Sequence, residues 1–159
     1  MIRAMDEVTL REIFRALDRE AVRYSIFGGI ALAAHGLSRA TKDLDLFVDP
    51  APANVAALCR ALSAVLADPA IAEITAEDLE EYGLVRYGLP EHDFVIDVTA
   101  RIGEAFRHDQ VETQSIVLLD VPVRVVTPRQ LARMKEAAGR PQDLADLVKL
   151  RERFGPEID

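Results

Sequence analysis

The sequence predicts an α/β (α+β) fold, in which a mixed β-sheet with flanking helices is followed by a C-terminal two-helix tail. Two observations predict it. Short runs rich in β-branched residues alternate with segments whose apolar residues recur at helical spacing. Proline and glycine then delimit two helical segments near the C-terminus. With 159 residues, 50% of them hydrophobic, the chain can bury one core. We therefore expect a single domain over 1–159, with a core over about 1–126 and a tail over about 127–154.

The first half of the chain predicts alternating helices and strands. Residues 6–20 carry apolar side chains at helical spacing, and VRYSIFGG is a short strand that ends at two glycines. A small-residue helix is expected over 30–35, a second strand over 43–48 and a longer helix over 54–66. The acidic stretch ITAEDLEEYG predicts a loop or a frayed helix.

The second half predicts two pairs of strands. LVRYGL and DFVIDVT form an antiparallel pair joined across Pro90 and Glu91, and a short helix is expected over 103–107. SIVLLDVPVRVV predicts two strands that turn near Asp120. Because proline cannot donate a ladder hydrogen bond, Pro122 makes the second of these an edge strand or a bulge.

The tail has clear helix boundaries. Thr127 is suited to the N-cap, Pro128 to the first helical position and Gln130 to the third, and Gly139 ends this helix. A last helix opens at Pro141 and continues to about residue 154.

Composition excludes several classes of protein. The balance of 19 basic and 27 acidic residues gives a net charge of −8, which argues against a broad basic face for nucleic acid but leaves room for a local basic pocket. No apolar run approaches the length of a membrane span, and no secretory signal is evident, so no membrane partner is expected. The single cysteine, Cys59, cannot form an internal disulfide, and a cytoplasmic location fits. Three widely separated histidines argue against a zinc site.

The most informative segment is FGGIALAAHGLSRATKDLDLFVD. Gly28 and Gly29 can bring bare backbone N–H groups close to an anion. Asp43 and Asp45 alternate with apolar residues, so on a strand both carboxylates point to one face. At an effective dielectric of about 20, two such charges about 5 Å apart repel by roughly 3 kcal/mol. Solvent-facing strand edges also carry such pairs, but apolar flanks here favour a strand inside the sheet and a divalent cation between the carboxylates.

A third acid occurs in a similar setting. Asp97 interrupts the β-branched strand DFVIDVT, where a buried carboxylate needs a partner. A metal shared with Asp43 and Asp45 would supply that partner, and three strand-borne carboxylates suit a two-metal site. A phosphate-binding turn beside such a site points to chemistry on a nucleoside triphosphate.

These motifs resemble a known superfamily. The pattern FGG-x13-DLDLFV followed by VIDV resembles the nucleotidyltransferases of the DNA polymerase beta fold. Together, GGIALAAHGLSRATKDLDL and KEAAGRPQDLADL are similar to the AbiEii-like nucleotidyltransferases, which include toxins of bacterial toxin–antitoxin systems. The resemblance extends from about residue 24 to about residue 150.

The resemblance implies roles for the motif residues. Gly28 and Gly29 would hold the triphosphate, Asp43 and Asp45 would bind the metals, and Asp97 would be the third carboxylate, placed to activate the acceptor hydroxyl. Where many relatives have serine this chain has Gly29, so phosphate contact there would come from the backbone alone.

Further residues are implied near the nucleotide. Arg39 would reach the triphosphate or hold the loop by pairing with an aspartate, and Thr41 lies beside it in the motif. Lys135 would neutralise phosphate charge, with a solvated helix lysine as the alternative, so Lys135→Ala is expected to lower nucleotide affinity with little change in melting temperature. Asp143 would contribute near the nucleotide, or merely cap its helix. His35 is expected to be a structural hydrogen-bonding residue, and His108 a surface residue.

The sequence therefore predicts a nucleotidyltransferase that uses Mg²⁺ (or Mn²⁺) and moves a nucleoside monophosphate from an NTP to an acceptor hydroxyl. An RNA end such as tRNA, a protein side chain or a small molecule such as an aminoglycoside are possible acceptors, and a cognate antitoxin or toxin is a possible partner. The alternative is a non-catalytic, antitoxin-like binding module. An antibiotic-modifying adenylyltransferase ranks lower, because it would be expected to carry a larger acceptor-binding domain.

Overall fold

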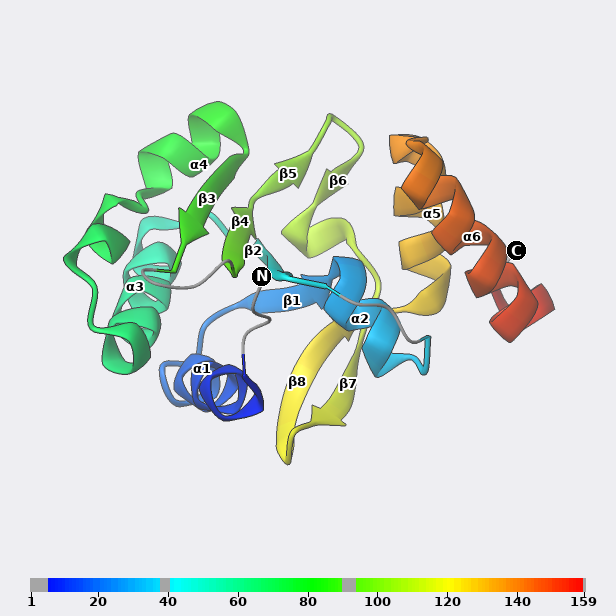
Figure 1. The fold of residues 1–159 in the computed structure, drawn as a ribbon. Helices are drawn as coiled ribbons and strands as arrows, with labels where there is room; N and C mark the ends of the chain where they lie inside the picture. Colours follow the sequence, from blue (N-terminus) through cyan, green and yellow to red (C-terminus); the bar gives the residue numbers. More distant parts are fainter. Residues whose placement is uncertain (1–5, 38–40, 90–93, 159) are drawn as a thin grey trace.

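The computed structural model describes residues 6–37, 41–89 and 94–158 of the chain, and Figure 1 shows its layers. Its main feature is a six-stranded sheet. In spatial order the strands are β3 (Leu84–Gly88), β4 (Val95–Thr99), β2 (Asp43–Val48), β1 (Tyr24–Phe27), β8 (Val121–Val126) and β7 (Thr113–Leu118). The sheet is mixed, because β2 runs parallel to β4 and β1 parallel to β8, while the other neighbours are antiparallel. The predicted mixed α/β fold is confirmed.

Helices surround this sheet on different sides. The α-helices are α1 (Glu7–Arg19), α2 (Gly28–Ala34), α3 (Pro52–Leu66), α4 (Ala76–Tyr82), α5 (Pro128–Ala138) and α6 (Pro141–Phe154). The 3₁₀ turns are η1 (Pro69–Glu73), η2 (His108–Gln110) and η3 (Gly155–Ile158). Helices α1 and α3 pack together, whereas α5 and α6 form a separate pair on the side of α2 (Figure 1). None of the helices in the described part of the chain is long and apolar enough to cross a membrane.

Alternation along β2 separates the core from the other face of the sheet. Leu44, Leu46 and Val48 are fully buried in the hydrophobic core. Asp43 and Asp45 are only partly buried and lie on the opposite face, as the period of two requires. Phe47 lies on the same face as the aspartates and is also fully buried, so along β2 charged groups occupy that face only at the start of the strand.

Local signals set the ends of the tail helices as predicted. The Thr127 hydroxyl accepts a hydrogen bond of 3.2 Å from the backbone N–H of Gln130. Gly139 follows α5 with a φ of +64°, a left-handed conformation that glycine adopts without strain. Pro141 then opens α6.

Two predicted local structures were wrong. The stretch expected to be a loop or a frayed helix contains α4, which is capped by Thr75 and closed by Gly83 in the left-handed region. Residues 103–107 do not form a helix but belong to a two-stranded hairpin, β5 (Arg101–Ile102) and β6 (Phe106–Arg107). The side chains of Ile102 and Phe106 pair across this hairpin and pack against the core, which outweighs the weak local helix signal.

Pro122 is tolerated for a local reason. β8 is not an edge strand, since it lies between β1 and β7. Among the described residues, however, β8 pairs with β1 only where Val125 lies opposite Ile26. Pro122 lies outside this short paired segment. At that position β8 is paired with β7 alone, and the edge character predicted for Pro122 holds only over that part of the strand.

Candidate active site

Two neighbouring strands bring the predicted aspartates together. β2 and β4 run parallel, and their register places Asp45 directly beside Asp97. Asp43 precedes Asp45 by two residues and therefore lies on the same face. The sheet thus gathers three carboxylates that lie more than 50 residues apart in the chain at their extremes.

The electrostatics of this group centre on Asp45. Burial raises the pKa of Asp45 to about 7, and the negative charges of Asp97 and Asp43 add to this shift. The positive charges of Lys135 and Arg86 act in the opposite direction but do not cancel it. The site therefore holds more negative charge than its own cations balance. Hard oxygen donors with excess negative charge fit a divalent cation such as Mg²⁺.

The glycine pair abuts this group. Gly28 and Gly29 form the first turn of α2, so the helix begins two residues earlier than predicted. Gly28 has a φ of +70°, and a Cβ atom built there would lie 2.1 Å from Oδ2 of Asp45. No side chain caps the start of this helix. The absence of a side chain at Gly28 therefore lets backbone lie against the central carboxylate, whereas the predicted approach of the glycine N–H groups to a phosphate stays a prediction.

Thr41 shapes the start of β2. Its hydroxyl donates to the backbone carbonyl of Asp43 and accepts from the Asp43 N–H, both at 3.2 Å. A Cβ atom on Gly29 would lie 2.8 Å from the Cβ of Thr41, so the threonine packs tightly against α2. Thr41 thus fixes the loop relative to the glycine turn. Arg39, also predicted near the nucleotide, lies outside the described residues.

Asp97 has a partner that the sequence analysis missed. Arg86 on β3 faces Asp97 in register and binds both of its carboxylate oxygens, Nε to Oδ1 at 2.9 Å and Nη2 to Oδ2 at 3.1 Å. The expected partner was a metal shared with Asp43 and Asp45. The sequence did contain a sign of this ion pair, because LVRYGL, the strand predicted to pair with DFVIDVT, carries an arginine.

The three aspartates do not form a ready-made metal site. Within residues 6–37, 41–89 and 94–158, no three His, Cys, Asp or Glu side chains are grouped closely enough to hold a metal ion. Metal binding by Asp43, Asp45 and Asp97 therefore remains a prediction. It requires the carboxylates to draw together and Asp97 to share or release Arg86.

The tail helices contribute a buried cation. Lys135 on α5 is 11% exposed and pairs with Asp146 at 3.0 Å and Asp143 at 3.3 Å, both on α6. The alternative of a solvated helix lysine was thus wrong. The Lys135 charge nonetheless acts on Asp45, so α5 brings positive potential toward the aspartates.

Asp143 caps its helix, which is one of the two roles considered for it, and its contribution near the nucleotide stays a prediction. It caps α6 by accepting from the backbone N–H of Arg140, and it also binds the side chains of Arg140 and Lys135. Burial alone would raise the pKa of Asp143, but these hydrogen bonds outweigh it and hold the pKa below its usual value. Asp143 is therefore ionised at neutral pH and orients Lys135.

The histidines serve structure. His35 is buried, and its Nε2 lies 2.8 Å from the carbonyl oxygen of Val126, as predicted for a structural residue. His108, predicted to be a surface residue, is only half-exposed, because its ring stacks on Phe47 and its Nδ1 lies 3.2 Å from the Phe47 carbonyl oxygen. Since a carbonyl only accepts, Nδ1 carries the proton in this contact.

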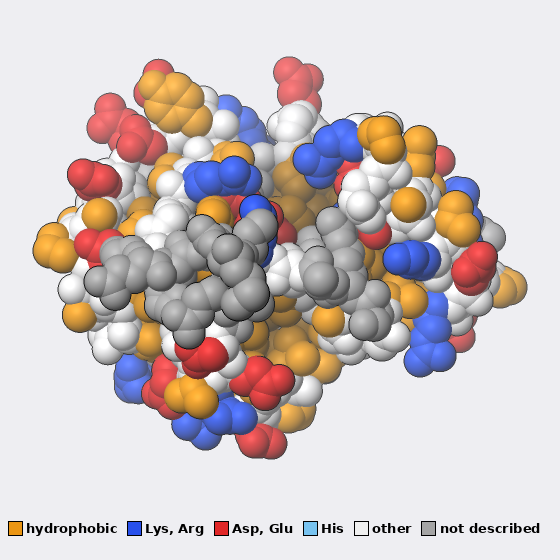
Figure 2. Space-filling view, viewed as in Figure 1, with side chains coloured by type: hydrophobic (Ala, Val, Ile, Leu, Met, Phe, Trp, Pro, Cys, Tyr) orange, Lys and Arg blue, Asp and Glu red, His pale blue; other side chains and the backbone are white. Residues whose placement is uncertain are grey.

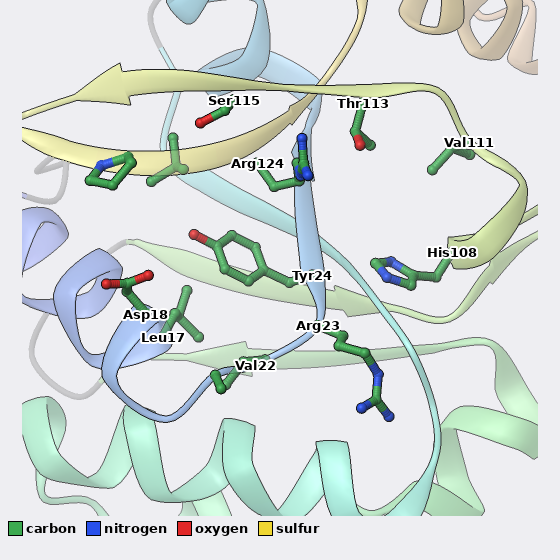
Figure 3. Close-up of a pocket in the computed structure, with 13 residues that line it drawn as sticks. Leu17, Asp18, Val22, Arg23, Tyr24, His108, Val111, Thr113, Ser115 and Arg124 are labelled. Atoms are coloured by element: carbon green, nitrogen blue, oxygen red, sulfur yellow. The ribbon is translucent and has the colours of Figure 1, made fainter.

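A cavity of about 440 Å³ lies away from the aspartates (Figure 3). Residues of α1, β1, β7 and β8 line it, together with His108, and the Tyr24 ring lies among them. The aspartates, the glycine pair and Lys135 do not contribute to its wall. The candidate site is instead the region between the sheet and the tail helices, where Figure 2 shows basic side chains on both sides of a hollow.

Comparisons with known proteins bear on this site. A family model described as "Nucleotidyl transferase AbiEii toxin, Type IV TA system" matches residues 15–159. No curated protein shows significant similarity to the chain.

Solved structures share the fold. A crystal structure of ANT(2'')-Ia in complex with adenylyl-2''-tobramycin is 17% identical with a TM-score of 0.56, over 95% of this chain and 90% of that one. A solution structure of the antibiotic-resistance factor ANT(2'')-Ia is 16% identical with a TM-score of 0.55, over 96% and 85% of the two chains. These likenesses show the fold.

Proposed function

The chain belongs to the AbiEii nucleotidyltransferase family, and on that premise we propose that it is a metal-dependent enzyme that transfers a nucleoside monophosphate from an NTP to an acceptor hydroxyl. Enzymes of this class release pyrophosphate as the α-phosphate bond to the leaving group breaks and the bond to the acceptor oxygen forms. The proposal assigns the reacting centre to the face of the sheet that carries Asp43, Asp45 and Asp97.

The position of Asp45 carries this proposal. It contacts the glycine turn on one side and lies in register with Asp97 on the other. Its raised pKa reflects first its burial and then the negative charges of Asp97 and Asp43, all of which disfavour the ionised carboxylate. A bound Mg²⁺ or Mn²⁺ would balance these charges and would offset charge on the phosphates. Asp43, Asp45 and Asp97 would hold the cation.

Gly28 and Gly29 would hold the triphosphate through backbone N–H groups. The start of α2 has no side-chain cap, so its first N–H groups can turn toward an anion. Lys135 would add positive charge from α5, held in place by Asp143 and Asp146. Arg39 and Thr41 complete the proposed nucleotide site, with Thr41 acting through the position of its loop.

Asp97 is the carboxylate proposed to face the acceptor. It would accept the hydroxyl proton as the acceptor oxygen attacks the α-phosphate. The acceptor is an RNA end such as tRNA, a protein or a small molecule, and the adenylylated tobramycin held by ANT(2'')-Ia shows that this fold accommodates a nucleotide joined to a small acceptor. The family description places such enzymes in type IV toxin–antitoxin systems, so a cognate antitoxin is the proposed protein partner.

Label transfer tests the proposal. Wild-type protein and Asp45→Asn are incubated with each α-labelled NTP, Mg²⁺ or Mn²⁺, and total tRNA, candidate proteins or aminoglycosides. Transfer by wild type that Asp45→Asn loses by about 10³-fold or more supports the enzyme. If the wild-type protein binds no NTP in the presence of metal and labels no acceptor, the non-catalytic binding module replaces it.

A further inference from the structure

Arg86 and Asp97 form the best-defined ion pair at the candidate site. Both nitrogens of the guanidinium edge bind, one to each carboxylate oxygen, at 2.9 and 3.1 Å. Such a two-point contact is the strongest form of arginine–carboxylate pairing. In this arrangement each carboxylate oxygen of Asp97 accepts a hydrogen bond from the positively charged guanidinium.

We infer that Arg86 is a positioning residue that occupies the place of a cation at Asp97 and releases that carboxylate when a divalent metal ion binds. This inference rests on the proposed function, because it concerns the same carboxylates. It assigns a role to a residue outside the glycine and aspartate motifs.

Geometry supports competition between Arg86 and a cation. Arg86, Asp97 and Asp45 occupy consecutive positions across three adjacent strands, so they point to the same face. The charges of Asp43 and Asp45 also raise the pKa of Arg86, after the larger effect of its bond to Asp97. Arg86 is thus paired with Asp97 and also attracted by the other two carboxylates, while Lys135 has the larger effect on Asp45. A cation held by these carboxylates would meet like charge from Arg86.

Exposure makes the release feasible. The Arg86 side chain is 64% exposed, whereas Asp97 is 10% exposed. Arg86 can therefore turn into solvent with little change in its own hydration, whereas the buried carboxylate of Asp97 that it leaves needs the metal ion as its new counter-ion. Asp97 stays in the sheet, where it can bind the metal or take a proton.

The test measures Mn²⁺ binding to the metal-free protein without nucleotide, by titration calorimetry or by the electron paramagnetic resonance signal of free Mn²⁺. Arg86→Gln should bind Mn²⁺ about fivefold or more tightly than wild type, since it removes both a competing ligand and a repelling charge. Its metal-free melting temperature should fall, and Mn²⁺ should restore it by a larger margin than in wild type.

Two variants serve as controls. Arg124→Gln removes an exposed arginine from the same face of the sheet, on β8, and should leave Mn²⁺ affinity unchanged. Arg86→Lys keeps the charge but loses the two-point contact, and its affinity should lie between those of wild type and Arg86→Gln.

The outcomes separate this inference from the proposed function. If Arg86→Gln lowers stability but leaves Mn²⁺ affinity unchanged or weaker, Arg86 is only structural and the inference is overturned. If wild type, Arg86→Gln and Asp45→Asn all fail to bind Mn²⁺, the inference and the proposed metal dependence fail together.

Discussion

Gly28 and Asp45 are in direct contact: a Cβ atom added to Gly28 would lie 2.1 Å from Oδ2 of Asp45. No side-chain atom can occupy that position without displacing the carboxylate. The contact ties the conformation of the glycine turn to the position of the central acid. It also explains why the first residue of the pair must be glycine, whatever binds there.

Gly28→Ala should therefore abolish nucleotidyl transfer while the protein still folds. Alanine at a φ of +70° costs about 1 kcal/mol, and the clash pushes Asp45 out of place. Label transfer should fall by about 10²-fold or more. Gly139→Ala is the matched control, because Gly139 has a similar φ of +64° but no close contact. Equal activity losses in the two variants would contradict the role given to Gly28.

Asp45 should make the metal-free protein less stable as pH rises. Its folded pKa is about 7 against an ordinary 3.8, so the folded state binds a proton more tightly than the unfolded state. This contribution is complete below about pH 4 and is lost as pH rises through about 7, with an upper limit of about 4 kcal/mol.

The decline is checked by measuring the free energy of unfolding with a chemical denaturant between pH 4 and 8, with a chelator present. Asp45→Asn should lack the decline and be more stable than wild type at pH 8. Addition of Mn²⁺ at pH 8 should raise the melting temperature of wild type but not that of Asp45→Asn. A wild-type stability independent of Asp45 over this range would show that the charge is balanced without metal.

Lys135→Ala should destabilise the fold as well as weaken nucleotide binding. The sequence alone predicted little change in melting temperature, but Lys135 is the ammonium that two buried carboxylates share. Its removal should cost about 3–5 kcal/mol. Thermal unfolding measures this loss of stability in Lys135→Ala. The control is Lys149→Ala, because Lys149 is an exposed lysine on α6.

The phosphate role of Lys135 needs a separate measurement. NTP affinity of Lys135→Ala is determined below its melting temperature and compared with that of Lys149→Ala. An affinity equal to the control would refute the phosphate role and leave Lys135 as a purely structural cation.

Ser25→Ala should leave stability unchanged or raise it. The Ser25 hydroxyl is fully buried, and it has no hydrogen-bond partner among the described residues. Removing the hydroxyl should raise the free energy of unfolding by up to about 1 kcal/mol. Thr127→Ala is the contrasting variant, since that hydroxyl donates to Glu112 and caps α5, and it should cost about 1–2 kcal/mol. A loss of stability in Ser25→Ala would indicate that an unseen partner satisfies the hydroxyl.

Much of the fold follows from patterns that act over a few residues. The alternation DLDLFV sufficed to place Asp43 and Asp45 on one face, and Thr127, Pro128 and Gly139 marked the ends of α5. Where the local sequence pattern was weak, tertiary contacts decided the structure instead. The helix expected over 103–107 gave way to a hairpin, because pairing Ile102 with Phe106 buries both side chains against the core.

By itself the sequence determined most of the helices and strands, the glycine pair and the acidic face of β2, since side-chain direction in a strand depends only on its period of two. Only the tertiary structure decided that Asp97 lies beside Asp45, that Arg86 faces Asp97 and that Lys135 is buried between α5 and α6. Strand order, register and helix packing join segments far apart in the chain. They depend on how the whole core is filled, and no short pattern encodes them.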